Sequence, residues 1–519
     1  MTRLEQVVSS LPEIYQPIYQ HEEFRFMSSR ACDDRLVHIR KVYDALQNQL
    51  NRQVRVLDLG CAQGYISLTI ASWGADVVGV DFFDKNIEVC NLLASEHEDY
   101  QILFVLNRVE DYLKYLKANE FDLVLGLSVF HHMCNMYGWE SVRDLLSETA
   151  AKIKVGIFEL ALNSEPVHWS KALPDDYKMV LQGFLCIKLL AYNGTHLSSK
   201  QRPLVFASNC YLYFQLTGLL EIDDVRLQSH DGAIALAKKR YFFAENKFVK
   251  CVDIRPARGT ISAAVQQEFR QELEFLEEMG GVEGFPNVYA LENNGDEIWI
   301  VREKIEGILL SEKIQHNEYF DAWDVIKQTL HWLVILERHG YYCNDVRTWN
   351  ILYDQHGNVW LIDYGSIGKR CSDCVWPWDL LLSFFIFMNE VFDRKYNKAF
   401  VRSTKMLTAI KRHISHQQYL DILKIHDAEN CFQAMYDILF STKGDIKDCS
   451  CDLRDKELLA LEALVEFVVN DWMQEKSRLY DAIKEIEQYK IYSSELLDKL
   501  TEVLIEHQKK LEELEEKLT

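Results

Sequence analysis

The chain has 519 residues, enough for about three domains of ordinary size. Hydrophobic residues make up 48% of it, as in an ordinary globular protein. The formal net charge of −22 argues against a main role in gripping nucleic acid, because a phosphate backbone selects for faces rich in lysine and arginine. We therefore expect no nucleic-acid partner, and an anionic substrate would have to be bound by local cations.

Apolar runs are short, and none approaches the ~18 residues that a membrane-spanning helix needs. The N-terminus carries Glu5 and lacks the apolar core of a signal peptide. We therefore predict a cytoplasmic protein. The 13 cysteines are scattered, with close pairs only at 371–374 and 449–451, so we favour free thiols over a metal site or a disulfide.

The first part of the chain alternates short apolar runs with helical patterns. Residues 1–53 have the pattern of amphipathic helices, and residues 161–225 form a mixed segment with three prolines. Between them, the alternation predicts a parallel sheet that is flanked by helices. The expected strands are residues 54–59, 77–80, 121–127 and 155–160.

A second pattern begins near residue 226. The pattern predicts several strands around one helix at 263–279, followed by mostly helix. The last proline is Pro377, so little beyond it forbids long helices. The expected strands are residues 234–238, 241–243, 247–254, 288–290 and 298–303.

From Ile483 the apolar residues follow a spacing of four and three over about five heptads, which is typical of a coiled coil. Three seam positions are polar, namely Lys490, Ser493 and His507, and the strict repeat is best from Leu497 onward. The alternative is a single long surface helix. The three predicted regions are then residues 1–215, 226–450 and 455–519.

The run from Val56 to Tyr65 is a strand that leads into a glycine turn. Gly60 and Gly64 allow the backbone to approach a ligand closely, since no Cβ intrudes. The Asp58-x-Gly60-x₃-Gly64 spacing differs from the dinucleotide fingerprint, and with Cys61 it resembles motif I of class I S-adenosylmethionine (SAM) methyltransferases.

Three more elements follow that motif in the order that the resemblance implies. Asp81 ends the second strand, where an acidic residue accepts the ribose hydroxyls, and Val109 and Glu110 would border the adenine. The fourth strand opens into Ser128, near the transferred methyl group. The alternative is a Rossmann-like domain that binds no nucleotide.

His131 and His132 stand in tandem at the end of the fourth strand, where we predict contact with the substrate. Methyl transfer to a phosphate needs no general base, because the oxyanion is already the nucleophile; it needs orientation and stabilisation of charge. Cations or imidazoles suit that task. Arg35 and Tyr15 are candidates to cap the same pocket, although by spacing alone they would be ordinary surface residues.

Residues 344–365 carry the second set of motifs. Asp345 with Asn350 five residues later, and Asp363 before an aromatic residue and a glycine, resemble the catalytic and metal loops of the protein-kinase-like fold. There an aspartate positions the attacking hydroxyl, and an asparagine and a second aspartate hold Mg²⁺ against the ATP phosphates. Arg347 stands where a lysine commonly contacts the γ-phosphate.

The preceding part of the chain supplies the other expected ATP-binding residues. Lys250 is placed to reach the α- and β-phosphates, with Glu272 as its helix partner and Glu268 as a rival one turn earlier. Residues 299–307, including Glu303, are typical of the hinge whose backbone binds adenine. A clear glycine-rich loop, a His-Arg pair before Asp345 and an Ala-Pro-Glu segment are missing, which argues against a standard protein kinase and leaves a pseudokinase as an alternative.

The succession of these motifs resembles the family of bifunctional kinase–methyltransferases that terminate bacterial polymannose O-antigens, the WbdD family. The stretches that carry the resemblance are residues 11–16, 56–64, 126–132, 345–350 and 362–366. The resemblance implies phosphorylation of the 3-hydroxyl of the terminal mannose by ATP, followed by SAM-dependent methylation of that phosphate. It places Tyr15, Arg35, His131 and His132 at the acceptor.

The same resemblance implies Asp345 as the catalytic base, with Asn350 and Asp363 on magnesium. It also implies a polymannose acceptor, a mannosyltransferase polymerase as partner, a trimer formed through the coiled coil, and a peripheral place at the cytoplasmic face of the inner membrane. The other readings are the same two enzymes acting on another sugar, a lipid or a protein, or a methyltransferase joined to an inactive kinase.

Overall fold

The structure is a computed structural model in which the chain divides into two compact units. The first comprises Met1–Gln266 and Met279–Lys304, and the second comprises Gln267–Glu278 and Ile305–Thr519. The predicted strand at 234–238 and the heptad positions from Ile483 to Leu518 lie outside the described residues. The structure describes residues 2–24, 27–195, 198–227, 239–255, 263–343, 345–369, 379–395, 413–425, 431–441 and 509.

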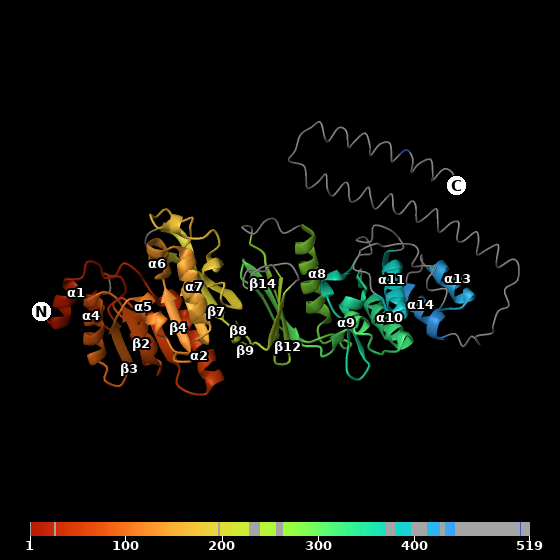
Figure 1. Ribbon diagram of the computed structural model, residues 1–519, viewed down its shortest axis with the longest axis horizontal. Coiled ribbons are helices and arrows are strands. Elements are labelled where there is room, and N and C mark those ends of the chain that lie inside the picture. Colours follow the sequence, from red (N-terminus) through yellow and green to blue (C-terminus); the bar gives the residue numbers. More distant parts are fainter. Residues whose placement is uncertain are drawn as a thin grey trace. The chain divides into compact units, whose positions relative to one another are not determined.

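A seven-stranded sheet organises the first unit (Figure 1). Its order is β3-β2-β1-β4-β5-β7-β6, with β1 to β5 parallel and β7 antiparallel to both of its neighbours. The predicted parallel sheet is confirmed. The strands are β1 (Arg55–Leu59), β2 (Asp76–Asp81), β3 (Gln101–Leu106), β4 (Leu123–Leu127), β5 (Val155–Glu159), β6 (Cys186–Thr195) and β7 (Ser198–Ser208).

Helices cover both faces of this sheet, because the strand residues that point to either face are mostly apolar. One core packs α2 and α3 on the sheet, the other packs α5, α6 and α7, and α1 packs with α4 at a third cluster. The helices are α1 (Arg3–Ser9), α2 (Asp33–Leu50), α3 (Tyr65–Ser72), α4 (Asp84–Ser95), α5 (Val109–Lys114), α6 (Phe130–Tyr137) and α7 (Trp139–Ala150).

The order of the strands reverses at β1, with β2 on one side of it and β4 on the other. In open sheets of this kind ligands bind outside the carboxyl ends of the strands at that reversal. The ends of β1 and β4 carry the glycine turn and Ser128, so the fold brings the two predicted motifs to one edge.

The mixed segment 161–225 has more strand than the sequence suggested. It contains β6 and β7 of the large sheet and a hairpin of β8 (Tyr211–Phe214) and β9 (Gly218–Glu221). Its residues Phe206 and Phe214 are completely buried. Prolines made this segment look irregular, but Pro203 lies within β7, which the structure pairs on both sides.

A five-stranded antiparallel sheet completes the first unit, in the order β10-β11-β12-β14-β13. Its residues Phe242, Val249 and Trp299 belong to the same hydrophobic core as Phe206 and Phe214, so the two sheets share one core. The strands are β10 (Asp224–Leu227), β11 (Lys239–Ala244), β12 (Lys247–Asp253), β13 (Val288–Asn293) and β14 (Glu297–Glu303).

Six buried or nearly buried charged residues join the two sheets, and we call them the junction cluster: Asp176, Lys178, Arg240, Asp253, Arg255 and Glu297. Lys178 and Arg240 both donate to Glu297, and all three are completely buried. Arg255 pairs with Asp253 and, at 2.7 and 3.0 Å, with both oxygens of Asp176. The cluster therefore binds the segment after β5 to the five-stranded sheet.

The second unit is mainly helical around short strands (Figure 1). Helix α8 (Ala263–Met279), which matches its predicted range, gives it residues 267–278. The other elements are β15 (Ile308–Leu309), α9 (Leu310–Gln315), α10 (Ala322–Arg338), β16 (Tyr342–Cys343), β17 (Ile351–Tyr353), β18 (Val359–Leu361), β19 (Ile367–Gly368), α11 (Asp379–Asp393), α13 (His416–Lys424) and α14 (Cys431–Tyr436).

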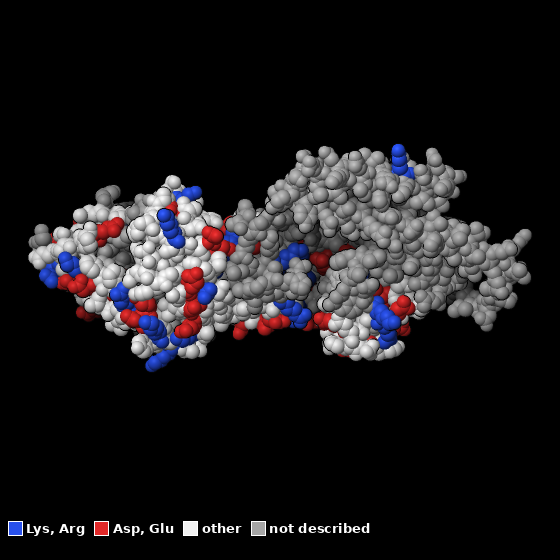
Figure 2. Space-filling model, turned by 45° about the horizontal axis from the view of Figure 1, so that its top comes forward, with Lys and Arg blue, Asp and Glu red and all other residues white. Residues whose placement is uncertain are grey.

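Among the described residues, no helix is long and apolar enough to cross a membrane. Acidic and basic side chains are interspersed over the described part of the face in Figure 2.

Candidate functional sites

The glycine turn between β1 and α3 has the backbone geometry that its sequence predicts. Gly60, Ala62 and Gly64 have φ values of 73°, 48° and 78°, a region that glycine adopts without strain. A Cβ on Gly64 would lie 2.9 Å from the Sγ of Cys90 and 3.1 Å from the ring of Phe104. The turn is therefore closely packed from behind and can exist only with glycine at this position.

Asp58 lies beneath this turn. Its carboxylate accepts a hydrogen bond of 2.6 Å from the hydroxyl of Ser67, which ties β1 to α3. Complete burial raises the pKa of Asp58 to about 6, although the Ser67 bond opposes the shift. Asp58 and the buried Cys61 thus brace the turn, and their predicted contact with a cofactor stays a prediction.

Asp81 is placed at the rim of the turn. It accepts backbone N–H bonds from Ala62 at 3.0 Å and Phe83 at 2.9 Å, and its side chain is only 6% exposed. Burial raises the pKa of Asp81, and the two N–H bonds limit that rise. A carboxylate has about four lone-pair sites, so it can still accept ribose hydroxyls.

The N-terminal segment is fastened to the glycine turn through Gln63. The amide oxygen of Gln63 accepts the backbone N–H groups of Tyr15 at 3.1 Å and Gln16 at 3.0 Å. Gln16 in turn accepts the backbone N–H of Tyr65 at 3.1 Å. These reciprocal bonds bring Tyr15, 48 residues away in sequence, to the edge where β1 and β4 end.

Val109 and Glu110 begin α5, next to Asp81. The N–H of Asn107 donates to the carbonyl of Asp81 at 3.0 Å, so the chain after β3 is joined to the chain after β2. Phe82 lies in the same region with 73% of its surface exposed. Sequence reasoning missed this exposed ring, although the position of Phe82 directly after Asp81, at the end of β2, could have indicated it.

A buried set of charges, which we call the pocket cluster, lies at the ends of β4 and β5. It consists of Arg30, Arg35, Ser128, Glu159, Glu165 and Arg202. Arg30 donates to the hydroxyls of Tyr15 at 2.5 Å and Ser128 at 2.8 Å, and it pairs with Glu159. Ser128 has a left-handed φ of 59°, which is strained for a serine and typical of functional sites.

The other two arginines hold the carboxylates of this cluster. Arg35 donates to Glu159 at 2.5 Å and also contacts Asp34, whose side chain is 48% exposed. Arg202 forms two bonds with Glu165, of 2.9 and 2.7 Å, and reaches Ser128 at 3.3 Å. Arg35 thus orients Glu159, and its predicted contact with an acceptor stays a prediction.

The buried members of the pocket cluster do not balance in charge. Three guanidinium groups face two buried carboxylates, and all five side chains are at most 7% exposed. One positive charge is therefore in excess, apart from the half-exposed Asp34. Asp34, which Arg35 contacts at 2.7 and 2.8 Å, meets that charge from the half-exposed rim, so the excess is confined to the buried part of the cluster and favours an anion there.

Two imidazoles border this cluster. The rings of His131 and His132 lie 4.0 Å apart, and Trp169 packs against them at 4.9 and 5.6 Å. Burial, together with the charges of His132, Arg202, Arg30 and His168, lowers the pKa of His131 to about 2. The pKa of His132 is lowered by burial, Arg202 and His168. Both rings are therefore neutral at physiological pH and are weak bases.

The structure thus brings Tyr15, Arg35, Ser128, His131 and His132 to one edge, as predicted. Arg30, Glu159, Glu165, Trp169 and Arg202 are members of this site that sequence reasoning missed. Glu159 was detectable as a carboxylate within the buried run of β5. The sequence around Arg202 carries no comparable sign, because β7 reaches the site only through long-range antiparallel pairing.

In the second unit, Asp345 and Asn350 form one compact loop. The side-chain amide of Asn350 donates to the backbone carbonyl and to the carboxylate of Asp345, both at 2.9 Å. The carbonyl of Asn350 accepts the N–H of Ile362 at 2.9 Å, which links this loop to the one that holds Asp363. The predicted spacing thus corresponds to direct contact between the two loops.

Asp363 has a left-handed backbone, with φ at 65°, and precedes Tyr364 and Gly365. The ring of Tyr364 stacks on Phe275 of α8 at 5.3 Å, and Tyr341 meets Phe275 edge-on at 5.1 Å. These aromatic contacts fix the Asp363 loop against α8. Asp363 is half-buried there.

Arg347 has a different environment from the one expected of a residue that contacts a phosphate. Its guanidinium pairs with Glu390 of α11 at 2.6 Å and lies 4.0 Å from the ring centre of Trp349. Thr348 also donates to Glu390, at 3.1 Å. In this arrangement Arg347 braces the catalytic loop, and its contact with the γ-phosphate stays a prediction.

The remaining predicted ATP-binding residues fall into different units. Lys250 lies in β12 of the first unit and is 3% exposed, and Glu303 ends β14, where its carboxylate accepts an amide bond of 2.9 Å from Asn287. Glu272 belongs to the second unit and is also 3% exposed. Pairing of Lys250 with Glu272 stays a prediction, and the rival side chain of Glu268 lies outside the described residues.

Within the described ranges, no group of three or more His, Cys, Asp or Glu side chains could hold a metal ion by itself. Asn350 and Asp363 nevertheless supply the oxygen ligands that suit Mg²⁺, which commonly takes few protein ligands and completes its shell with phosphates and water. The residues present therefore fit magnesium that is bound together with a nucleotide.

The fold and these sites define a chain with a Rossmann-like class I methyltransferase domain followed by a protein-kinase-like domain. A profile described as "Methyltransferase domain" matches residues 50–141. The O-antigen chain terminator bifunctional methyltransferase/kinase WbdD of Escherichia coli is 38% identical over 396 residues, which are 75% of this chain and 56% of that protein. The chain thus spans little more than half the length of the curated relatives it matches.

Solved structures extend this similarity. The bifunctional kinase-methyltransferase WbdD, at medium resolution, matches with 32% identity and a TM-score of 0.72 over 89% of this chain and all of that one. A low-resolution WbdD structure with an ordered C-terminal bundle matches with 30% identity and a TM-score of 0.77 over 96% of this chain and all of that one. The chain therefore belongs to the WbdD family.

Proposed function

We propose that the protein terminates polymannose O-antigen chains in two steps. The kinase-like domain phosphorylates the 3-hydroxyl of the terminal mannose with ATP and Mg²⁺, and the methyltransferase domain then methylates that phosphate with SAM. The observation that carries this proposal is the pocket cluster at the ends of β4 and β5, where three buried arginines face two buried carboxylates beside histidines whose pKa values are lowered.

The acceptor chemistry follows from those histidines. A hydroxyl acceptor would need a general base with a pKa near the working pH. The pKa of His131, at about 2, is too low for that role, and burial beside Arg202 and His168 lowers the pKa of His132 as well. An acceptor that is already an anion needs no base, and a phosphate monoester meets that condition at neutral pH.

The pocket residues then have defined tasks. When bound, SAM supplies the methyl group on a sulfonium. Arg30 and Arg202 stabilise the phosphate oxygens by charge-assisted hydrogen bonds. The neutral rings of His131 and His132 orient the acceptor, and they lie in the first turn of α6, where the helix dipole also favours an anion.

For the first step, Asp345 accepts the proton of the attacking mannose hydroxyl. Asn350 holds the Asp345 carboxylate in position and, with Asp363, supplies ligands to the magnesium. Within the first unit, Lys250 would contact the α- and β-phosphates, and the strand end at Glu303 would border the adenine. The product of this step is the nucleophile of the next, so the two activities are ordered by their chemistry.

The wider setting belongs to the same proposal. The heptad repeat beyond residue 483 forms a trimeric coiled coil; a C-terminal bundle is named for a WbdD structure. A mannosyltransferase polymerase is the expected partner, and the complex works from the cytoplasm at the inner face of the inner membrane.

Mass spectrometry of synthetic mannose oligomers tests the proposal. With ATP and Mg²⁺ we expect a gain of one phosphate, and with SAM added a further gain of one methyl. Asp345→Asn should lower phosphorylation by roughly 10²–10⁴-fold, yet should still methylate a mannoside 3-phosphate that is supplied ready-made. If the protein bound ATP but phosphorylated no mannoside, the proposed acceptor would be wrong. If it did not bind ATP at all, the proposed kinase activity would be wrong.

A further inference from the structure

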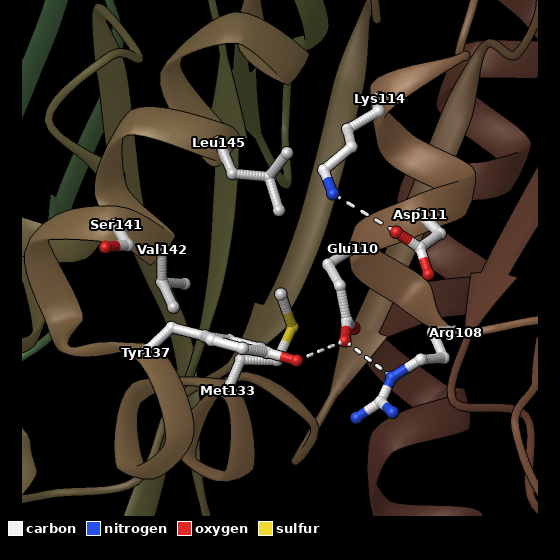
Figure 3. Close-up of a pocket in the computed structure, with 9 residues that line it drawn as sticks. All are labelled: Arg108, Glu110, Asp111, Lys114, Met133, Tyr137, Ser141, Val142 and Leu145. Atoms are coloured by element: carbon white, nitrogen blue, oxygen red, sulfur yellow. Dashed lines mark hydrogen bonds and ion pairs between the residues drawn. The ribbon is translucent and has the colours of Figure 1, made fainter.

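A groove of about 500 Å³ lies between α5 and α7, with α6 at one end (Figure 3). Charged side chains that include Arg108 and Lys114 form one wall, and apolar side chains that include Met133 and Leu145 form the other. Tyr137 spans the groove from α6 toward Glu110 on α5, as Figure 3 shows. The groove is thus crossed by one polar bridge.

The bridge fixes one oxygen of Glu110. The hydroxyl of Tyr137 donates to Oε1 of Glu110 at 2.8 Å, and Nε of Arg108 donates to the same Oε1 at 2.8 Å. Both side-chain bonds therefore converge on Oε1, and Oε2 retains its capacity to accept a donor from a ligand. The Glu110 side chain is 16% exposed and lines the groove.

The carboxylate is charged at neutral pH. Partial burial would raise the pKa of Glu110, but bonds from its own backbone N–H, from Tyr137 and from Arg108 lower it below the usual value. An ionised carboxylate only accepts hydrogen bonds. It therefore favours an amino group at that position and repels a carbonyl oxygen.

Glu110 is also placed where the base of a nucleoside would lie. Leu106 pairs with Asp81, the proposed ribose ligand, and the N–H of Asn107 donates to the backbone carbonyl of Asp81. Glu110 is three residues beyond Asn107. A nucleoside whose ribose is held at Asp81 extends its base from the sugar toward this segment. The exposed ring of Phe82 offers a face on which the base can stack.

We infer that Tyr137 and Arg108 are positioning residues that hold Oε2 of Glu110 against the 6-amino group of the cofactor's adenine, so that the site selects a 6-amino purine over a 6-oxo purine. This inference rests on the proposed use of SAM. It assigns the selection of the purine base to a hydrogen-bonded contact between α5 and α6. The two residues that provide this contact lie outside the glycine motif.

Calorimetric titration of the full chain with S-adenosylhomocysteine and with S-inosylhomocysteine tests the inference, since the second ligand replaces the 6-amino group by a carbonyl, with a proton on the neighbouring N1. The unmodified protein should prefer the adenosyl ligand by at least about tenfold, as expected of hydrogen bonds to a charged group. Tyr137→Phe and Arg108→Met should each lower that ratio by roughly threefold or more. Tyr115→Phe is the matched control, because Tyr115 follows α5 and is 83% exposed; its ratio should not change.

The outcomes separate this inference from the function on which it rests. A loss of affinity that is equal for both ligands in Tyr137→Phe would mean a merely structural role and would overturn the inference. An unchanged ratio in both variants would overturn it as well. If the unmodified protein bound neither ligand, the SAM assignment itself would fall, and the inference with it.

Discussion

The junction cluster and the pocket cluster are both buried sets of charges within the first unit, but they differ in balance. In the junction cluster three cations face three carboxylates, and Glu297 accepts from both Lys178 and Arg240. In the pocket cluster three arginines face two buried carboxylates, beside two neutral imidazoles, and the third carboxylate, Asp34, is half-exposed. A balanced set of buried charges stabilises a fixed arrangement, whereas an excess of buried positive charge favours the binding of an anion. We therefore expect the balance of buried charge, more than burial itself, to distinguish the structural cluster from the functional one.

The largest effect, on the free energy of unfolding, should come from a substitution in the junction cluster. Glu297→Gln leaves Lys178 and Arg240 buried without their shared carboxylate, and removing one partner of a buried pair costs about 3–5 kcal/mol. Urea denaturation should show this loss in the free energy of unfolding. Glu98→Gln is the control, because Glu98 is exposed and should change little. Equal stabilities of the two variants would mean that the junction cluster is not structural.

The next effect should be on methyl transfer. Arg30→Met removes the guanidinium that bonds Ser128 and Tyr15, so kcat/KM for a mannoside 3-phosphate should fall about 10²–10³-fold, as when one charge-stabilising donor is removed from an active site. Binding of S-adenosylhomocysteine should persist. The control is Arg40→Met on α2, where Arg40 is exposed and pairs with Asp44. Unchanged turnover in Arg30→Met would exclude the pocket as the acceptor site.

The pH dependence of stability offers a third contrast. Because the pKa of His131 in the folded protein is about 2, the unfolded chain binds a proton below pH ~6.5 that the folded chain does not. Stability from this group is therefore complete above pH ~6.5 and falls as the pH falls toward 2. Between pH 7.5 and 5 the loss should be about 2 kcal/mol.

His131→Gln should abolish that part of the acid sensitivity, measured by urea denaturation at each pH. His316→Gln, at an exposed histidine, should retain it. An identical pH profile in the unmodified protein and His131→Gln would show that the ring is not held neutral.

The smallest effect, on both stability and methylation rate, should come from Asp34 at the solvent-facing side of the pocket cluster. Asp34 pairs with Arg35 but is half-exposed, so Asp34→Asn should cost only about 0.2–1 kcal/mol. Its methylation rate should stay within a fewfold of the unmodified rate. A loss as large as that of Arg30→Met would mean that the rim carboxylate belongs to the functional balance.

The sequence predicted the parts of these sites that depend on local spacing. The glycine turn, the strand that ends in Asp81 and the loop of Asp345 and Asn350 could be predicted because a few consecutive residues determine their geometry. Even the range of α8 followed from apolar periodicity.

The charge balance of the pocket could not be predicted in this way. Arg202 reaches it from β7 and Glu165 from the loop after β5, and neither position has a local pattern that indicates its partner. The pairing of Arg347 with Glu390, 43 residues later, was likewise not evident from its place in the motif, and its contact with a phosphate stays a prediction. Long-range ion pairs depend on the tertiary arrangement, and one sequence does not reveal it.

One titration tests the central claim that the pocket cluster is completed by a phosphate. A mannoside 3-phosphate and the unphosphorylated mannoside would each be titrated into the protein saturated with S-adenosylhomocysteine. We predict that the phosphorylated sugar binds at least about tenfold more tightly, as expected of charge-assisted hydrogen bonds, and that Arg30→Met removes the difference. Equal affinities for the two sugars in the unmodified protein would contradict the account.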